Sequence, residues 1–376
     1  MKPKLAFVNN QLDKIKKADL YREMRYGHVN GPYIIIRKKS LLNLCSNDYL
    51  GIYISDNVSG QMQSSSRLVS GNDVSFQILE KKLAKHKSQE GSLIFPTGYM
   101  ANIGVISTLI EKNDLIISDE LNHASIIEAC KITGAKILIY KHNDMDDLSS
   151  KLNHSNKRKF VLTEGIFSMD GDFADLKKIT EVAEKKNAIT ILDDAHGDFT
   201  VGRDGKGTPN HFDVAKKIDL YVSSLSKGLG SFGGYVATQK NIIELLINKS
   251  KSFIYTSALP SFLVEHSLNK FNSNREKQRK KLWKNVKVLS SGLKQIGYNF
   301  SSTTHIIPII IGKEKTTIEF GKYLFRKGIY AQPIRYPTVP HNKARIRISV
   351  TAWLSKNQIE NALDIFESAA RRFEIV

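Results

Sequence analysis

Residues 223–234 read Ser-Ser-Leu-Ser-Lys-Gly-Leu-Gly-Ser-Phe-Gly-Gly and place one lysine, Lys227, in a stretch of small side chains. The apolar residues 218–222 before it and 235–238 after it predict a buried strand on each side. Small side chains between two strands let the backbone approach a bound ligand closely. Desolvation of a lysine amine lowers its pKa, which favours nucleophilic attack or Schiff-base formation. The alternative is a flexible loop with a solvated lysine, since a lone glycine-rich segment is a weak signal.

The chain around this segment alternates between strand and helix patterns, which predicts an α/β fold with a mainly parallel sheet. The predicted strands are residues 92–95, 115–118, 137–140, 160–163 and 189–192, in addition to the two beside Lys227. The predicted helices in the same region are residues 74–86, 98–110, a segment from about 125, and 176–186. This region forms the predicted large domain, residues 41–270.

The two ends of the chain have a different texture. Helical spacing over residues 5–26 and strand patterns at 33–37 and 41–45 predict an N-terminal segment, which we bound at residues 1–40. Residues 271–376 predict a smaller α+β domain. Its predicted elements, with the helix leading into it, are helices at 259–271, 275–296, 317–327 and 356–373 and strands at 306–311 and 345–350.

Bulk composition narrows the classes of function. The chain has 376 residues and a net charge of +19, without a run of about 18 apolar residues. We therefore expect no membrane span. The lysine-rich start lacks a secretory pattern, and Cys45 and Cys130 are too few for a disulfide framework, so we expect a cytoplasmic protein. The basic residues are scattered and match no nucleic-acid-binding motif, which favours an acidic substrate over a nucleic-acid partner.

Ligands of open α/β sheets bind beyond the carboxyl ends of the strands, so the residues there are candidates. Gly98 and Tyr99 follow a predicted strand and begin a helix. The free N–H groups there could bind a phosphate, and the alternative is an ordinary helix start without a ligand. His123 follows the next strand, where it either caps a turn or stacks on a flat ring. Asp193 and His196 leave another buried strand. An aspartate there can keep a pyridinium nitrogen protonated, and a metal site is the less favoured alternative because a third ligand is missing nearby.

These segments together resemble the α-oxoamine synthases, pyridoxal-phosphate enzymes of aminotransferase fold type I. The resemblance covers about residues 41–352. It rests on the following motifs, given with the number of their first residue: Cys45-Ser-Asn-Asp-Tyr-Leu-Gly, Ser66-Arg-Leu-Val-Ser-Gly, Leu121-Asn-His-Ala-Ser, Thr163-Glu-Gly-Ile-Phe-Ser-Met-Asp-Gly-Asp, Leu192-Asp-Asp-Ala-His-Gly, Ser226-Lys-Gly-Leu-Gly-Ser-Phe-Gly-Gly, Tyr336-Pro-Thr-Val-Pro and Arg345-Ile-Arg. Six internal motifs in the family's order make chance agreement negligible.

The resemblance implies a fold type I transferase with pyridoxal 5'-phosphate as cofactor. It implies that Lys227 forms the internal aldimine, that His123 stacks on the pyridine ring and that Asp193 pairs with the ring nitrogen. Further cofactor contacts that it implies are His196 at the phenolic oxygen, Ser168 near the ring, and Gly98, Tyr99 and Ser224 at the phosphate.

The resemblance also implies where the substrates bind. Asn47 and Arg347 would orient the amino-acid carboxylate, and Thr338 would touch the substrate. Arg22 and Arg25 are candidates for a distal carboxylate on the acyl chain. Family members are homodimers with the site at the subunit boundary, so a homodimer with a shared site is implied as well.

Members of the family differ in their substrates. This chain is most similar to those that condense L-alanine with a pimeloyl thioester of coenzyme A or acyl carrier protein, an acyltransferase step of biotin biosynthesis. The alternatives within the family are glycine acetyltransferase, against which Glu164 counts, and 5-aminolevulinate synthase. A basic nucleic-acid-binding protein is the remote alternative. The chain departs from the family at a shortened segment, residues 52–65, where Ser64 and Ser65 replace a glycine-rich run, and at Phe76, where a histidine is usual.

Overall fold

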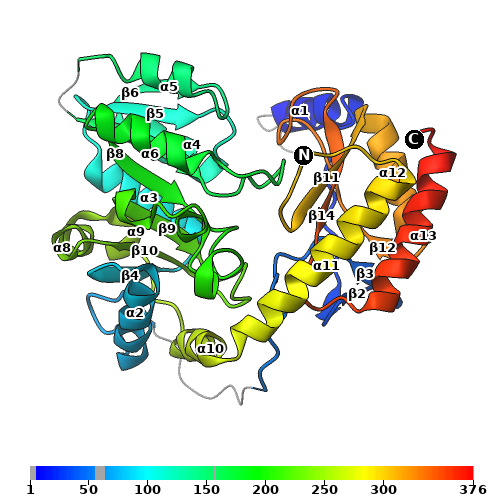
Figure 1. The fold of residues 1–376 in the computed structure, drawn as a ribbon, viewed down its shortest axis with the longest axis horizontal. Helices are drawn as coiled ribbons and strands as arrows, with labels where there is room; N and C mark the ends of the chain where they lie inside the picture. Colours follow the sequence, from blue (N-terminus) through cyan, green and yellow to red (C-terminus); the bar gives the residue numbers. More distant parts are fainter. Residues whose placement is uncertain (1–5, 56–63, 156–157, 376) are drawn as a thin grey trace. The chain divides into compact units, whose positions relative to one another are not determined.

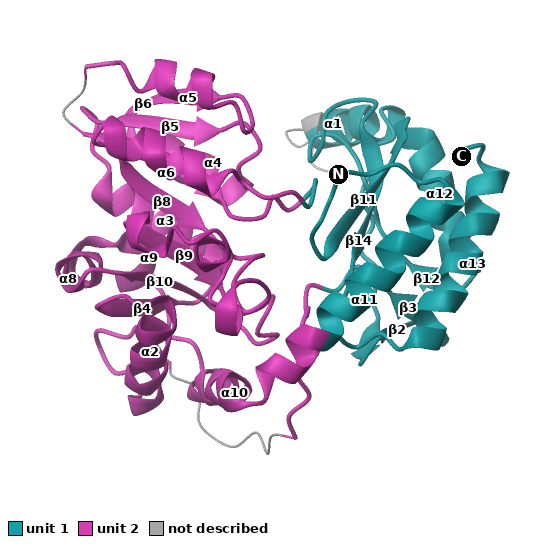
Figure 2. Ribbon diagram, in the orientation of Figure 1, with its two compact units in different colours: residues 1–46, 169–171, 281–376 teal, residues 47–168, 172–280 magenta. Residues whose placement is uncertain are grey.

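The computed structural model describes residues 6–55, 64–155 and 158–375, and these form two compact units. Unit 1 consists of Met1–Ser46, Met169–Gly171 and Lys281–Val376, and unit 2 of Asn47–Ser168 and Asp172–Lys280 (Figure 2). The shortened segment at residues 52–65 lies largely outside the described residues. Each unit is described below by itself.

Unit 2 is built on a seven-stranded sheet in the order β4-β10-β9-β8-β7-β5-β6 (Figure 1). Its strands are β4 (Gly91–Phe95), β5 (Leu115–Asp119), β6 (Lys136–Tyr140), β7 (Lys159–Glu164), β8 (Ile189–Asp193), β9 (Leu220–Ser224) and β10 (Gly234–Thr238). The pairs β6-β5-β7-β8-β9 are all parallel, whereas β10 runs antiparallel to both of its neighbours. The mainly parallel sheet expected from the alternating pattern is thus confirmed.

The helices of unit 2 include several that pack directly on this sheet. The helices are α2 (Val74–Lys87), α3 (Gly98–Leu109), α4 (Ala124–Thr133), α5 (Met145–Lys151), α6 (Leu176–Lys185), α7 (Thr208–His211), α8 (Lys240–Lys249), α9 (Lys251–Ile254) and α10 (Ser261–Asn272). Among those that pack directly on the sheet are α2, α3, α6 and α8. The core contains Phe95, Val105, Ile116 and Val222, which are fully buried. Such burial of β-branched and aromatic side chains stabilises the unit by about 1.5–3 kcal/mol per side chain.

Unit 1 holds two small sheets. One has the order β1-β2-β3-β12 and the other β11-β14-β13. The strands are β1 (His28–Asn30), β2 (Tyr33–Ile36), β3 (Lys39–Asn43), β11 (Ile306–Gly312), β12 (Ile329–Tyr330), β13 (Pro333–Ile334) and β14 (Ala344–Ser349). The helices are α1 (Ala6–Lys17), α12 (Glu314–Arg326) and α13 (Lys356–Arg372), with most of α11 (Arg275–Ile296).

The predicted helix over residues 5–26 is wrong beyond Lys17. Asp19 takes a left-handed backbone with φ of 56°, and residues 20–27 are irregular. The guanidinium of Arg335 donates hydrogen bonds to the carbonyl oxygens of Asp19 and Tyr21. These carbonyls are therefore satisfied by a distant side chain instead of by a continuing helix.

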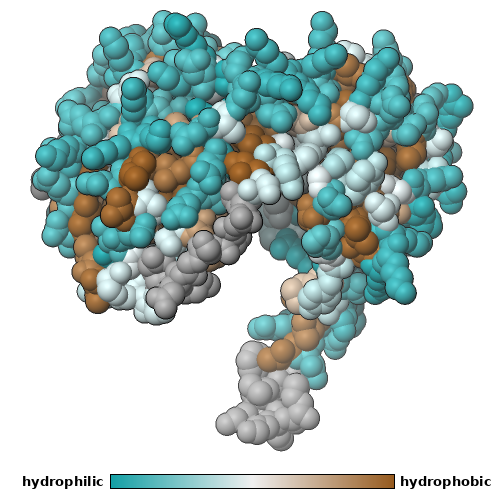
Figure 3. All heavy atoms as spheres, turned by 90° about the horizontal axis from the view of Figure 1, so that it is seen from below, coloured by the Kyte–Doolittle hydropathy of each residue, from teal (hydrophilic) through white to brown (hydrophobic). Residues whose placement is uncertain are grey.

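The surface in Figure 3 is mainly hydrophilic, with separate hydrophobic patches. Among the residues that the structure describes, none of the helices is both long and apolar enough to cross a membrane.

Candidate active site

Lys227 lies in the connection between β9 and β10, residues 225–233, which we call the Lys227 loop. Backbone hydrogen bonds hold it: Leu225 N donates to Gly233 O at 2.9 Å and Gly230 N donates to Lys227 O at 2.9 Å. A Cβ on Gly228 would lie 2.4 Å from the carbonyl oxygen of Asp198, so only glycine allows this close approach. The loop is therefore packed against the chain after β8, which argues against a flexible loop with a solvated lysine.

The amine of Lys227 faces His196. Its Nζ lies 2.9 Å from His196 Nε2, and His196 Nδ1 lies 2.7 Å from the hydroxyl of Tyr49. That hydroxyl donates to Asn47 Oδ1 at 3.0 Å. One consistent proton arrangement follows, in which Lys227 donates to Nε2 and Nδ1–H donates to Tyr49. In this arrangement His196 accepts from the lysine, and hydrogen bonds connect Lys227 through His196 and Tyr49 to Asn47.

Asp193 is the last residue of β8, and its carboxylate is held by two donors. Asn102 Nδ2 donates to Oδ2 at 2.7 Å, and the backbone N–H of Ala195 donates to Oδ1 at 3.0 Å. Asn102 comes from α3, which packs on β9 and β10. These two donors fix the direction of the carboxylate.

His123 is the N-cap residue of α4. Its Nδ1 accepts a hydrogen bond from the backbone N–H of Ser125 at 3.2 Å, so the capping interpretation is confirmed. Asn102 also donates to Ser125 Oγ at 2.9 Å, which links His123 to the donor of Asp193. Burial lowers the pKa of His123, with the charge of Lys227 acting in the same direction and that of Asp193 opposing it. A neutral, flat ring held by its cap is suited to stacking on an aromatic cofactor.

Gly98, Gly234 and Ser224 form a narrow cradle at the start of α3. A Cβ on Gly234 would lie 2.4 Å from Gly98 N, and one on Gly98 would lie 3.3 Å from Ser224 Cβ. The N-cap Thr97 accepts from Met100 N at 3.1 Å, and Ser224 Oγ lies 2.7 Å from Ser226 Oγ. Backbone N–H groups of a helix first turn beside hydroxyls fit a phosphate group. Tyr99 is the second residue of this helix and is half exposed.

Glu164 is a residue of this site that the sequence did not reveal as such. It ends β7, stands opposite Asp193 in the parallel register and is 3 % exposed. Burial, and then the charge of Asp193, raises the pKa of Glu164 well above its ordinary value. Its Oε1 has no hydrogen-bond partner among the described residues. Glu164 thus places a second buried carboxyl group, with a raised pKa, beside Asp193.

Two further residues singled out from the sequence, Ser168 and Phe76, also lie in unit 2. Ser168 is half-buried in the chain after β7, at the carboxyl end of the sheet. Phe76, at the position where a histidine is usual, is buried in α2, and the guanidinium carbon of Arg67 lies 4.2 Å from its ring centroid. Phe76 is therefore part of the packing, together with a cation–π contact.

The predicted substrate residues are divided between the units. Asn47 belongs to unit 2, and Arg22, Thr338 and Arg347 belong to unit 1. Arg22 Nη2 donates to Thr338 Oγ1 at 3.3 Å, and both line a cavity of about 540 Å³. Arg25, Arg335 and Lys322 line the same cavity, which gives it a strongly basic wall. Arg347 is buried in β14 and donates to Ser349 Oγ at 2.7 Å.

The sequence matches the aminotransferase class I and II family over residues 39–366. The chain belongs to that family. It is 40 % identical over 389 residues to the 8-amino-7-oxononanoate synthase of Thermoanaerobacter pseudethanolicus, covering 99 % of this chain and 98 % of the relative. It is 37 % identical over 393 residues to the 8-amino-7-oxononanoate synthase of Treponema denticola, with coverage of 99 % and 98 %.

Solved structures give the same result for the fold. The serine palmitoyltransferase of Sphingomonas wittichii superposes with a TM-score of 0.92 at 27 % identity, covering 100 % of this chain and 99 % of that chain. The 8-amino-7-oxononanoate synthase of Francisella tularensis superposes with a TM-score of 0.76 at 28 % identity, covering 89 % and 99 %. The resemblance to α-oxoamine synthases is thereby confirmed. This chain is a pyridoxal-phosphate-dependent acyltransferase of fold type I.

Proposed function

We propose that this protein condenses L-alanine with a pimeloyl thioester to give 8-amino-7-oxononanoate, a step of biotin biosynthesis. A carbon–carbon bond forms between the alanine Cα and the acyl carbonyl, while the thiol and carbon dioxide leave. The observation that carries the proposal is the Lys227–His196 contact of 2.9 Å in the unit that also holds Asp193 and the glycine cradle. The full-length similarity to 8-amino-7-oxononanoate synthases supports the choice of substrates.

Pyridoxal phosphate, when bound, supplies an electron sink for negative charge at the alanine Cα. The residues that we propose to hold it share one unit and the carboxyl end of one sheet. They are Lys227 as covalent attachment, Asp193 at the ring nitrogen, His123 on the ring face, His196 at the phenolic oxygen, Ser168 near the ring, and Gly98, Tyr99 and Ser224 at the phosphate.

Lys227 is the residue that we propose to move the Cα proton. The contact with His196 holds the amine of Lys227 in place, and His196 is itself oriented by Tyr49. A general base has to lie within hydrogen-bond reach of the proton that it removes. Asn102 holds the carboxylate of Asp193 in place through a hydrogen bond of 2.7 Å.

Arg22 is proposed to bind the far end of the acyl chain. The cavity that Arg22, Arg25 and Arg335 line has the charge to pair with the distal carboxylate of a pimeloyl group. Thr338 hydrogen-bonds to Arg22 and is proposed to contact the substrate beside it. Asn47 and Arg347 are proposed to orient the alanine carboxylate.

A panel of substrates tests this function. The purified holoenzyme is offered L-alanine, glycine or L-serine, each with pimeloyl, acetyl, succinyl and palmitoyl thioesters, and thiol release is followed together with the mass of the amino ketone. We expect the alanine–pimeloyl pair to give the highest kcat/KM, with the pimeloyl coenzyme A and carrier-protein thioesters compared directly. A higher kcat/KM for any other pair would reject the proposal in favour of glycine acetyltransferase, 5-aminolevulinate synthase or serine palmitoyltransferase activity.

We also propose that the protein is cytoplasmic. The domain bounds that we propose remain residues 1–40, 41–270 and 271–376.

We propose further that the protein is a homodimer. Exposed apolar side chains gather around residues 68–74 and at Tyr255, where Val69 is 78 % and Tyr255 is 81 % exposed. Ala258 N donates to Ser65 O, which brings these two segments together. Such a patch suits burial against a second copy. Light scattering should give twice the chain mass of 42.3 kDa, and a monomer would contradict this part.

A further inference from the structure

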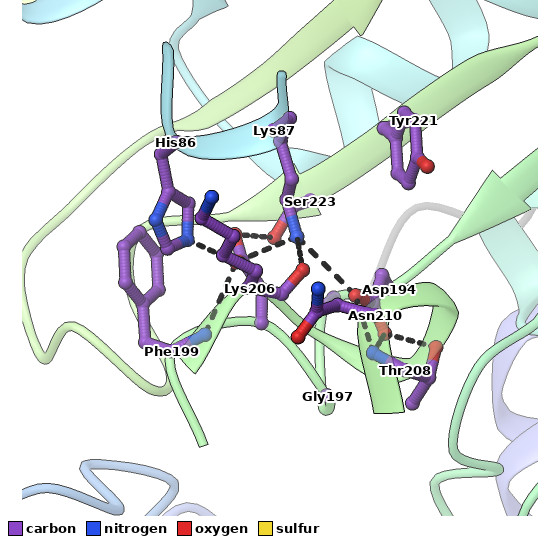
Figure 4. A network of polar contacts seen from close by, with 12 residues as sticks. His86, Lys87, Asp194, Gly197, Phe199, Lys206, Thr208, Asn210, Tyr221 and Ser223 are labelled. Carbon is purple, nitrogen blue, oxygen red and sulfur yellow. Dashed lines mark hydrogen bonds and ion pairs between the residues drawn. The ribbon is translucent and has the colours of Figure 1, made fainter. Parts of the chain in front are cut away.

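A buried polar cluster lies where the end of α2 meets β9 and the chain that follows β8 (Figure 4). It consists of His86, Lys87, Asp194, Asp198 and Ser223, and we call it the Lys87 cluster. The side chains of Lys87, Asp194 and Asp198 are at most 1 % exposed. Burying three charged groups is costly unless they neutralise one another, so the cluster calls for a reason beyond packing.

Lys87 is the last residue of α2 and forms the centre of the cluster. Its Nζ lies 2.7 Å from Asp198 Oδ1 and 3.3 Å from Asp194 Oδ2. It also donates to the carbonyl oxygen of Lys206 at 3.0 Å. The three donor positions of the ammonium are thus used by two carboxylates and one backbone carbonyl.

The two carboxylates are held by further donors. Thr208 Oγ1 donates to Asp194 at 2.7 Å, whereas Ser223 Oγ donates to Asp198 at 2.9 Å and His86 Nε2 lies 3.0 Å from it. A Cβ on Gly207 would lie 1.8 Å from Asp194 Oδ2 and 2.8 Å from Lys87 Nζ, so the groups are tightly enclosed. The hydroxyl of Tyr235 and the ring of Tyr221 also face the cluster.

The charges of the cluster depend on Lys87. Burial raises the pKa of Asp194 to about 6, against the lowering effect of Lys87. At Asp198 burial acts in the same direction, but the charge of Lys87 and the hydrogen bond of His86 outweigh it and lower the pKa. Burial lowers the pKa of His86, so the histidine does not replace the cation. Without Lys87, the two buried carboxylates would lose the ammonium that both of them contact, and Arg275 would remain as a cation that acts on Asp198.

The cluster is connected directly to the site. Asp194 and Asp198 flank His196 on the same short segment, and the carbonyl oxygen of Asp198 is the atom against which Gly228 packs. Phe199 has φ of 64°, a left-handed backbone that is unfavourable for a bulky residue and persists only where its surroundings hold it. A displacement of Asp198 would therefore move both His196 and the Lys227 loop.

We propose that Lys87 is a positioning residue, which fixes the Lys227–His196 pair by pinning Asp194 and Asp198. This inference rests on the proposed attachment of the cofactor to Lys227. Groups that act on Lys227 from the neighbouring elements include His196 by contact and His123 and Glu164 by charge. Lys87 acts on it through the chain of Asp198 and Gly228.

The test is the pH titration of the visible absorbance of the bound cofactor. It compares wild-type holoenzyme with Lys87→Met, with Lys87→Arg and with the matched control Lys85→Met, which removes an exposed lysine from the same helix turn. We expect Lys87→Met to shift the midpoint by about one pH unit, because Asp194 and Asp198 are then no longer pinned and the His196 contact with the Lys227 nitrogen is displaced. Lys87→Arg should titrate close to the wild type, and Lys85→Met should match it.

An unchanged midpoint in folded Lys87→Met overturns the proposal, and so does an equal shift in Lys87→Arg, since the loss would then be one of packing. If Lys87→Met does not fold, Ser223→Ala decides: it removes one donor from Asp198, and a midpoint equal to the wild type refutes the proposal. A wild-type protein without any pH-dependent visible band would instead refute the attachment of the cofactor to Lys227.

Discussion

At the scale of single residues, the site depends on side chains that direct the proposed catalytic groups. Asn102 does so for Asp193 through a hydrogen bond of 2.7 Å to a charged acceptor. We expect Asn102→Ala to lower kcat about tenfold, because such a hydrogen bond contributes about 1.5–3 kcal/mol and its loss misdirects the carboxylate. Steady-state kinetics check this, with the exposed Asn248→Ala as control. Wild-type kinetics in folded Asn102→Ala would show that Asp193 needs no such support.

The sequence placed the candidate site residues at one edge of the sheet but did not reveal their partners. Lys227, His123 and Asp193 lie at or just after the ends of strands that the alternating pattern reveals, so their common edge follows from the topology. The sequence did not reveal that Glu164 and Asn102 lie beside Asp193, because those contacts depend on the tertiary structure. Glu164 faces Asp193 only since β7 pairs with β8, a pairing that no local pattern encodes.

At the scale of elements, the strand pattern predicted all seven strands of the large sheet and its mainly parallel arrangement, but not the antiparallel direction of β10. The reversal of β10 depends on the short Lys227 loop, which turns the chain back beside β9. The residue at which α1 ends could not be predicted from local sequence either. The carbonyl oxygen of Asp19, just beyond α1, accepts a hydrogen bond from Arg335, which is more than 300 residues away in sequence. Long-range side-chain contacts of this kind override helical spacing.

His142 connects the ends of the neighbouring strands β5 and β7. Its ion pairs should make the free energy of unfolding depend on pH. Its ring lies 3.1 Å from Asp119, at the end of β5, and 2.7 Å from Asp172, after β7. Burial opposes the charged ring, but these hydrogen bonds raise the pKa of His142 from 6.5 to about 10. Because the pKa of His142 is higher in the folded state than in the unfolded state, protonated His142 stabilises the folded protein fully below pH 6.5. This stabilisation is lost as the pH rises towards 10.

Denaturation of wild type and His142→Gln between pH 6 and 10 checks this. We expect the difference in unfolding free energy to be largest at the acidic end and to shrink across the window. The exposed His154→Gln should show a small difference that does not change with pH in this way. A difference that grows with pH would contradict the ion pairs.

The start of α13 provides a test of local stability. Ser355 accepts from Gln358 N while the Gln358 side chain accepts from Ser355 N, which is a complete capping box. Ser355→Ala should lower the unfolding free energy by about 1 kcal/mol in urea denaturation. Ser291→Ala, at an exposed position inside α11, should leave it equal or slightly higher. An equal effect of both changes would mean that the box contributes nothing.

At the scale of the whole molecule, the net charge of +19 bears on substrate capture. A basic protein attracts an acidic thioester more than zwitterionic alanine, and salt screens that attraction. Raising the ionic strength should therefore increase the KM of the pimeloyl thioester several-fold, with a smaller change in the KM of alanine. Equal changes in the two constants would show that the charge serves another purpose.

Lys227 is proposed to hold the cofactor covalently and to take part in one specific reaction. The most direct measurement incubates purified wild type and Lys227→Ala with pyridoxal phosphate, removes the unbound cofactor, and records the visible absorbance before any amino acid is added. L-Alanine and pimeloyl thioester are then added, and the mass of the product is recorded. We expect the visible band and 8-amino-7-oxononanoate for the wild type, and neither for Lys227→Ala. A Lys227→Ala protein with both the band and the product would contradict the role of Lys227.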